Sequence, residues 1–262
     1  MSFGLGSNFY TAAAHLGLKN RLVISERNDP AACPHPHFRN MVFGCAHKIV
    51  FQTHDALQCF PERLKKRGCV IPNPISGTIA HPYEGVRKKT ITAVGRLEPQ
   101  KNYPLLLEAF ASFHKKYPEY ILQIFGRGFL LTELQKMAQD LDIAEVVRFE
   151  GYVKEIHEKI KDAGMYVLSS DYEGISNALL EAMALGLPVI STDCPIGGSK
   201  LCITHEKNGL LVPVGDVKSM EEAMSRLAAD GELAGRLGQA ALEVRQRFSE
   251  ETIMAEWNRV LI

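Results

Sequence analysis

The stretch SSDYEGISNALLEAMALGLPVIST, residues 169–192, decides the fold of this chain. The apolar run Met165–Ser169 predicts a buried strand that ends where the stretch begins, and we expect a helix to follow that starts at Gly174, Ile175 and Ser176. A strand, a turn and a helix in this order are the unit from which parallel sheets are built. In open α/β sheets, ligands bind at the carboxyl edge of the strands. We therefore expect a ligand site in the turn between this strand and this helix.

Two carboxylates and a helix start lie in the same stretch. Glu173 falls in the turn, and Glu181 follows about two helical turns later. Glutamates at this spacing are common on solvated helices, but Glu181 has apolar neighbours, where a carboxylate is costly unless it meets a specific partner. Gly174, Ile175 and Ser176 form the expected helix start, whose unpaired N–H groups and positive dipole end favour an anionic ligand. The stretch therefore offers two carboxylates beside a helix end suited to phosphate.

Alternation of strands and helices extends over residues 88–216. It predicts a parallel sheet that is covered by helices on both faces. Helices are expected at Tyr103–Lys116, Lys218–Asp230, Glu232–Arg247 and near Glu250–Leu261. Strands are expected at Thr90–Val94, Tyr120–Phe125, Val146–Phe149, Met165–Ser169, Pro188–Ser191 and Gly209–Pro213.

Residues 1–75 are predicted to hold two or three further α/β units. Strands are expected at Arg21–Ser25, Lys48–Gln52 and Cys69–Ile71, and Pro72, Asn73 and Pro74 form a stiff break that we interpret as a domain junction. We therefore expect a first domain at residues 1–75, a second at residues 76–247, and a last helix at residues 248–262.

Composition limits the functional classes. The 262 residues contain 30 Lys plus Arg and 30 Asp plus Glu, so the chain lacks the basic field of nucleic-acid-binding proteins. No apolar run approaches the ~20 residues of a transmembrane helix, and the start lacks the basic segment of a signal peptide. The six irregularly spaced cysteines are typical of reduced thiols in a cytoplasmic protein.

Two motifs resemble metal sites but favour other interpretations. Cys33, His35 and His37 lie in an extended, proline-containing segment that has no second ligand pair at zinc spacing. Asp140 and Asp142 match the DxD pattern, but they fall in a polar connection and are interpreted as a solvated turn. We expect no metal and no cofactor.

The string EGISNALLEAMALGLPVI (173–190) resembles the EX7E motif of the family 4 glycosyltransferases, which have the two-domain GT-B fold. Four further segments agree with this family in order and spacing: ITAVGRLEPQKNYPLLLEAF (91–110), ILQIFGRG (121–128), VRFEGYV (147–153) and NGLLVPVGD (208–216). The resemblance covers residues 70–262. It is weaker in residues 1–70, where VISERNDP (23–30) and KIVFQTHDALQCFP (48–61) are similar to bacterial enzymes that build polyprenyl-linked and surface glycans.

This resemblance implies transfer of a sugar from a nucleotide sugar to a glycan or polyprenyl-linked acceptor, with retention of configuration. It implies UDP as the default nucleotide, a mild preference for N-acetylhexosamine, and a cytoplasmic enzyme, with the inner face of the plasma membrane left open. Two alternatives remain: a nucleotide-sugar-binding remnant without transfer activity, and another GT-B enzyme such as an epimerase or a phosphorylase.

Arg96 and Lys101 lie five residues apart at a predicted strand–helix turn, where two cations can converge on a diphosphate. The resemblance implies that they hold the donor pyrophosphate and stabilise it as it leaves. It also implies that Glu173 contacts the transferred sugar and that Glu181 accepts hydrogen bonds from the ribose. The other implied donor-binding residues are Gly95, Gly126, Gly128, Gly174, Ile175, Ser176, Asn177 and Leu180, with the segment Glu150–Val153 near the base.

The N-terminal region departs from the family pattern. It lacks the first strands and the glycine-rich loop of a complete first domain, and a fragment, a truncated reading frame and a short natural protein all remain open. Glu26, Arg27 and Asn28 follow a predicted strand and could face the cleft, although a turn with a structural arginine is the alternative. An incomplete sheet exposes an edge and an apolar face, so we expect self-association.

Overall fold

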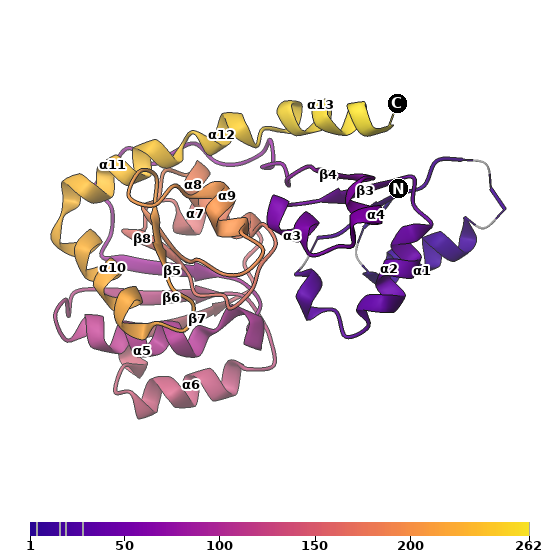
Figure 1. Cartoon of the computed structure of the whole chain (residues 1–262). Helices are drawn as coiled ribbons and strands as arrows, with labels where there is room; N and C mark the ends of the chain where they lie inside the picture. Colours follow the sequence, from indigo (N-terminus) through magenta and orange to yellow (C-terminus); the bar gives the residue numbers. More distant parts are fainter. Residues whose placement is uncertain (4, 16, 19, 28, 262) are drawn as a thin grey trace.

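A computed structural model describes residues 1–3, 5–15, 17–18, 20–27 and 29–261. The described chain forms two parallel sheets that lie side by side (Figure 1). We call the part that contains the first sheet, residues 1–75, the N-terminal lobe, and the part that contains the second sheet the C-terminal lobe. The predicted α/β architecture with parallel strands is confirmed, while the domain boundaries stay a prediction.

The described residues of the N-terminal lobe form four parallel strands in the order β1-β2-β3-β4. The predicted strands are present within one or two residues, and a short first strand was not predicted. The strands are β1 (Ser2–Phe3), β2 (Val23–Ser25), β3 (Lys48–Phe51) and β4 (Gly68–Val70). The helices are α1 (Leu5–Ala14), η1 (Pro30–Ala32), α2 (Pro36–Gly44), α3 (His54–Gln58) and α4 (Glu62–Lys65).

The C-terminal lobe contains six parallel strands in the order β10-β9-β8-β5-β6-β7. The strands are β5 (Thr90–Val94), β6 (Ile121–Phe125), β7 (Val147–Gly151), β8 (Met165–Leu168), β9 (Val189–Thr192) and β10 (Leu210–Val212). The chain runs from β5 outward to β7 and then returns to the other side of β5 with β8. The point between β5 and β8 is therefore the topological switch point, where open α/β sheets bind ligands.

Helices cover both faces of this second sheet, as the sequence predicts (Figure 1). One face packs against α5 (Tyr103–His114), α6 (Leu131–Asp140) and α10 (Val217–Ala229). The other face packs against α7 (Ile156–Ile160), α8 (Asn177–Ala184) and α12 (Val244–Arg247). The remaining elements are η2 (Pro99–Lys101), η3 (Ala144–Val146), α9 (Gly198–Cys202) and α11 (Gly231–Ala241). In the described part of the chain, every helix is too short or too polar to cross a membrane.

Two segments tie the lobes together. The last helix, α13 (Glu250–Leu261), runs back over the N-terminal sheet (Figure 1), where Ile253 and Trp257 pack against Val23 and Val50. The loop after β9 sends Ile196 into the core of the N-terminal lobe. Ile196 has a φ of 76°, which is rare for a β-branched residue and is tolerated here because the buried side chain holds it. Both contacts fix the lobes on either side of one cleft.

Candidate functional site

A cavity of about 950 Å³ lies between the lobes, at the carboxyl ends of β5 and β8. It occupies the topological switch point that the strand order defines. The C-terminal lobe contributes Arg96, Lys101 and Glu173 to its wall, and the N-terminal lobe contributes Arg27 and Gln52. The structure therefore brings together residues that are up to 146 positions apart, from Arg27 to Glu173, in one place.

Lys101 and Glu173 form an ion pair in this wall, with Lys101 Nζ donating to Glu173 Oε1. Their side chains are only 13% and 10% exposed, so water screens the pair weakly. Ser170 Oγ donates a second hydrogen bond to Glu173 Oε1 at 3.1 Å. A lysine has three N–H donors, so Lys101 can keep this contact and still donate to a phosphate oxygen.

The loops after β5 and β8 are joined by hydrogen bonds that position this pair. Ser169 Oγ donates to the carbonyl oxygen of Lys101 at 2.7 Å, and Gln100 Nε2 donates to the carbonyl oxygen of Tyr172 at 2.9 Å. Asn102 adopts a left-handed conformation with a φ of 41°, caps α5, and donates to Asp171 Oδ1 at 2.6 Å. The turn that carries Glu173 is therefore held by the loop that carries Lys101.

Arg96 lines the same cavity, but its environment differs from that of Lys101. Its side chain is 67% exposed and pairs with Glu98 at 2.8 Å. An exposed pair contributes little to stability, so Arg96 can exchange Glu98 for a ligand at low cost. The two cations that the sequence singled out thus share one wall, one buried and one exposed.

The helix start differs from the prediction. Helix α8 begins at Asn177, and Ser176 is its N-cap, accepting a hydrogen bond from the amide of Leu179 at 3.4 Å. The prediction that Gly174, Ile175 and Ser176 form the first helical residues is therefore wrong, because the Ser176 side chain takes the capping role. Ser176, Ile175 and Asn177 do line the cavity.

Gln52 reaches this turn from the N-terminal lobe. Its side-chain oxygen accepts a hydrogen bond from the amide of Ile175 at 3.1 Å. A Cβ on Gly174 would clash with Gln52 Oε1 and would lie 2.8 Å from the carbonyl oxygen of Arg27, so glycine is needed for the lobes to meet here. Sequence reasoning missed Gln52, because nothing local predicts a partner 123 residues away.

Glu181 also lines the cavity and lies near a partner that the sequence did not reveal. Glu181 Oε2 is 3.2 Å from Nε2 of His157, which lies on α7, although the atoms lack the alignment of a hydrogen bond. A charged pair forms here only when the imidazole is protonated. Glu181 therefore keeps acceptor capacity for a ligand hydroxyl.

Two buried tyrosines lie beside the carboxylates. Burial raises the pKa of Tyr103, and the negative charge of Glu173 raises it further. Burial also raises the pKa of Tyr166, with smaller contributions from Tyr103, Glu173 and Glu181. Both phenols therefore stay neutral across the physiological range and do not serve as bases.

Four of the expected donor-binding residues do not line the cavity: Gly126, Gly128, Gly174 and Leu180. A Cβ on Gly126, which has a φ of 144°, would overlap the carbonyl oxygen of Gly95, and a Cβ on Gly128 would overlap that of Leu97. The close approach at these glycines is therefore between parts of this chain. Leu180 is buried in the hydrophobic core. Gly95 itself lines the cavity, and the role of all these residues in donor binding stays a prediction.

The three candidate cleft residues of the N-terminal lobe, Glu26, Arg27 and Asn28, differ in where the structure places them. Arg27 lines the cavity. Glu26 is buried, and its Oε1 accepts a hydrogen bond from the backbone amide of Arg27 at 3.0 Å. Asn28 lies outside the described residues.

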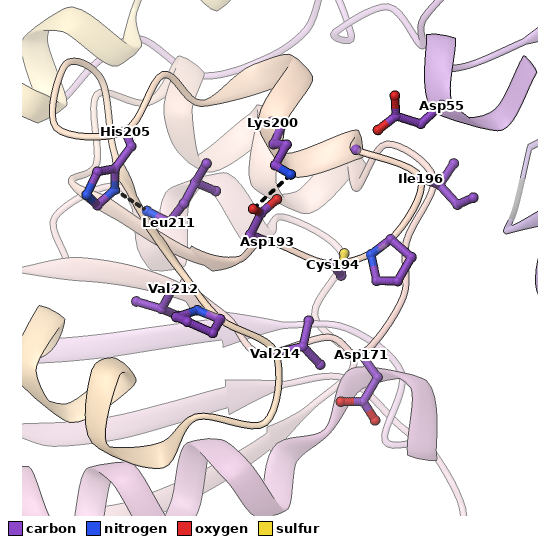
Figure 2. Close-up of a pocket in the computed structure, with 13 residues that line it drawn as sticks. Asp55, Asp171, Asp193, Cys194, Ile196, Lys200, His205, Leu211, Val212 and Val214 are labelled. Atoms are coloured by element: carbon purple, nitrogen blue, oxygen red, sulfur yellow. Dashed lines mark hydrogen bonds and ion pairs between the residues drawn. The ribbon is translucent and has the colours of Figure 1, made fainter. Parts of the chain in front are cut away.

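A second cavity of about 740 Å³ continues along the sheet edge at β9 and β10 (Figure 2). Asp55, Asp171 and Asp193 line it, and Lys200 pairs with Asp193 at 3.0 Å. Burial raises the pKa of the Cys194 thiol beside it to about 11. Three carboxylates against one lysine make this cavity unfavourable for phosphate, in contrast to the first.

The described residues include no group of three or more His, Cys, Asp or Glu side chains arranged to hold a metal ion. Asp140 ends α6, Asp142 follows it, and both are exposed. His35 and His37 are also exposed.

Comparison with known proteins gives one family and a consistent fold. The family described as "Glycosyl transferases group 1" matches residues 82–244. An exopolysaccharide phosphotransferase of Streptomyces coelicolor is 33% identical over 216 residues, which are 81% of this chain and 23% of that protein. An uncharacterized glycosyltransferase of Haemophilus influenzae is 28% identical over 82% of this chain and 61% of its own length. The chain therefore spans less than two thirds of either relative.

Solved structures agree on the fold. Anabaena HepE, solved with UDP-glucose, has a TM-score of 0.88 at 17% identity, and the match covers 99% of this chain and 77% of that one. Identity at this level shows the fold alone. The GT-B type of α/β fold expected from the sequence is confirmed.

Proposed function

This chain belongs to the group 1 glycosyl transferases, and from this premise we propose that it transfers a sugar from a nucleotide sugar to a glycan or polyprenyl-linked acceptor. We further propose a family 4 enzyme that retains anomeric configuration, uses a UDP-linked donor, and prefers an N-acetylhexosamine. The observation that carries the proposal is the cavity at the switch point, which gathers Arg96, Lys101, Glu173 and Glu181 in one wall. The UDP-glucose complex of HepE supports the choice of nucleotide.

In this proposal, Lys101 and Arg96 bind the donor diphosphate. Lys101 is oriented by Glu173 and has N–H groups left to donate, and Arg96 exchanges its exposed partner Glu98 for a phosphate oxygen. Once the donor is bound, both cations are in place to stabilise the negative charge that develops as the diphosphate leaves. Because two cations already serve the diphosphate, we propose a reaction that is independent of metal ions.

The two glutamates bind hydroxyl groups. Glu173 stands beside the cations and would accept from hydroxyls of the transferred sugar, whereas Glu181 lies further along α8 and would accept from the ribose. The exposed ring of Tyr152 lines the same cavity, with Arg127 Cζ 5.9 Å from its centroid, and offers a stacking surface for the base. In this proposal, these groups of the wall bind the sugar, the diphosphate, the ribose and the base of the donor.

In this proposal, configuration is retained because the acceptor hydroxyl attacks the anomeric carbon on the same face from which the diphosphate leaves. The acceptor hydroxyl then approaches beside the departing phosphate, and the phosphate oxygens can take its proton. Glu173 accepts hydrogen bonds from Lys101 and Ser170, and in this proposal it binds the transferred sugar and does not act as a base.

Contacts beyond the cleft are further proposals. Large apolar side chains are exposed on α1 and α2, including Phe9, Tyr10, Phe38 and Met41. They support self-association, or contact with the inner face of the membrane where a polyprenyl-linked acceptor would be presented. We propose a cytoplasmic enzyme.

Calorimetry with UDP and uridine tests the donor assignment. We expect Arg96→Ala to weaken UDP binding by about 1.5 kcal/mol, the low end for a charge-assisted contact, because the side chain is exposed. Uridine binding should not change. Arg259→Ala, at an exposed arginine on α13, is the matched control. Equal losses for UDP and uridine would refute the diphosphate role of Arg96.

A further inference from the structure

Arg27 is held in an environment that is unusual for a cation. It directly follows Glu26 at the end of β2 and lines the large cavity from the N-terminal lobe. Its Cζ lies 5.2 Å from the ring centroid of Phe3 and 5.5 Å from that of Trp257, and these two rings contact each other edge to face with centroids 5.8 Å apart, so the guanidinium packs against one side of an aromatic pair. Loss of hydration at this position lowers the pKa of Arg27 to about 10.

No carboxylate compensates this charge within the described residues. Lys101 pairs with Glu173 and Arg96 pairs with Glu98, whereas no Asp or Glu forms an ion pair with Arg27. Burial of a cation without a counter-charge is costly. The two aromatic faces offset only part of this cost. A negatively charged ligand would offset the remaining cost of desolvating the guanidinium.

The hydrogen bonds of Arg27 also differ from those of structural arginines. Among the described residues, only Nη1 donates, to Asn73 Oδ1 at 2.9 Å and to the carbonyl oxygen of Ile71 at 3.4 Å. Arg39 and Arg87 each donate to main-chain carbonyl oxygens or a side-chain amide through two or more nitrogens. The hydrogen bonds of Arg39 and Arg87 stabilise the fold. The Nε and Nη2 groups of Arg27 remain able to donate to another partner.

Arg27 stands opposite the proposed transfer site. Its carbonyl oxygen packs against Gly174, and Asn73, which accepts from Arg27, donates to Asn177 Oδ1 at 2.8 Å at the start of α8. The guanidinium therefore lies across the cleft from the wall that holds Arg96 and Lys101. The donor diphosphate has those two cations on its own side.

We propose that Arg27 binds an anionic group of the acceptor, a phosphate or a carboxylate near the attacking hydroxyl. This inference rests on the proposed function. The planar fork of an arginine matches both groups with two parallel hydrogen bonds, and the contacts with Phe3, Trp257 and Asn73 restrict its position before the ligand arrives. A neutral acceptor would not compensate the partly desolvated charge of Arg27.

Saturation-transfer NMR on UDP-saturated protein tests the proposal with three probes that share a methyl reporter: methyl phosphate, methyl glucuronide and methyl glucoside. We expect one of the two anions to bind at least tenfold more tightly than the neutral glucoside. Arg27→Met, which keeps an unbranched apolar side chain against the rings of Phe3 and Trp257, should remove this preference. Arg27→Lys should keep part of it, and UDP affinity should stay within twofold in both variants.

Arg39→Met is the matched control. Arg39 is buried, more fully than Arg27, and stacks on an aromatic ring, with its Cζ 4.2 Å from the centroid of Phe60, but it does not line the cavity. This variant should keep the preference for the anion. Thermal unfolding with and without UDP shows that each variant is folded and binds the donor.

Two results would overturn the proposal. If neither anion binds the UDP-saturated wild type more tightly than the glucoside, Arg27 is a structural arginine. If Arg27→Met weakens UDP as strongly as it weakens the anion, the partner of Arg27 is the donor diphosphate. Failure of wild type to bind UDP would refute the proposed function instead, and the anion titration without UDP would still decide the role of Arg27.

Discussion

The two walls of the cleft hold their charges in opposite ways. In the C-terminal wall, the buried Lys101 meets the buried Glu173, and the pair is close to neutral before any ligand binds. In the N-terminal wall, Arg27 meets two aromatic rings and an amide, and its charge is not neutralised by any described carboxylate. The ion pair holds Lys101 and Glu173 in place for binding at little electrostatic cost. The guanidinium of Arg27 lacks such a partner among the described residues and would be stabilised by a bound anion.

This difference teaches how to separate binding groups from groups that hold the fold together. A paired buried charge contributes to both tasks, so its loss damages stability and binding together. A partly buried charge without a counter-charge costs stability in the free protein, so its replacement by an apolar side chain should not destabilise the fold even where binding is lost. Stability and affinity must therefore be measured on the same variants.

The largest expected effect comes from breaking the buried pair. Lys101→Met leaves Glu173 buried without a counter-charge, which should destabilise the fold by about 3–5 kcal/mol in urea unfolding. The double variant Lys101→Met with Glu173→Gln should regain most of that stability. Neither variant should bind UDP measurably. If Lys101→Met is as stable as the wild type, Lys101 and Glu173 do not stabilise each other. The inferred difference between a paired and an unpaired wall would then be wrong.

A medium effect is expected at Glu181, which lies near His157 rather than a permanent cation. Glu181→Gln keeps the shape but loses a charged acceptor, so UDP binding should weaken by about 1.5–3 kcal/mol while the fold stays intact. The preference of the wild type for UDP over 2′-deoxy-UDP should shrink in this variant. Glu222→Gln, on the exposed side of α10, serves as the control. A variant that binds normally but unfolds early would show that Glu181 is structural.

The smallest effect is expected from removal of metal. The cations of the C-terminal wall serve the diphosphate in our proposal, so a chelator should leave UDP binding and sugar transfer unchanged. Recovery of a lost signal by manganese would contradict this. It would also assign the exposed Asp140 and Asp142, or another set of oxygen ligands, a role that we do not expect.

The elements of the C-terminal lobe could be predicted because their signals are local. Strand β5 has the predicted bounds, Thr90–Val94, since its apolar residues fill a buried strand between polar loops. The predicted helix Glu232–Arg247 divides into α11 and α12, because the chain turns at residues 242–243 to follow the sheet. Strand β1 was missed, because two residues give no periodicity.

The sequence by itself determined the parallel α/β fold, the family, and the residues of the C-terminal wall, since Arg96, Lys101, Glu173 and Glu181 all lie in short motifs next to predicted strands. Only the tertiary structure decided their partners. His157 beside Glu181, Gln52 on the Ile175 amide, and Trp257 over Arg27 come from other elements or the other lobe. Periodicity and motif spacing report the local burial of a residue, but a charge or an amide finds its partner only when the helices and the two lobes pack together.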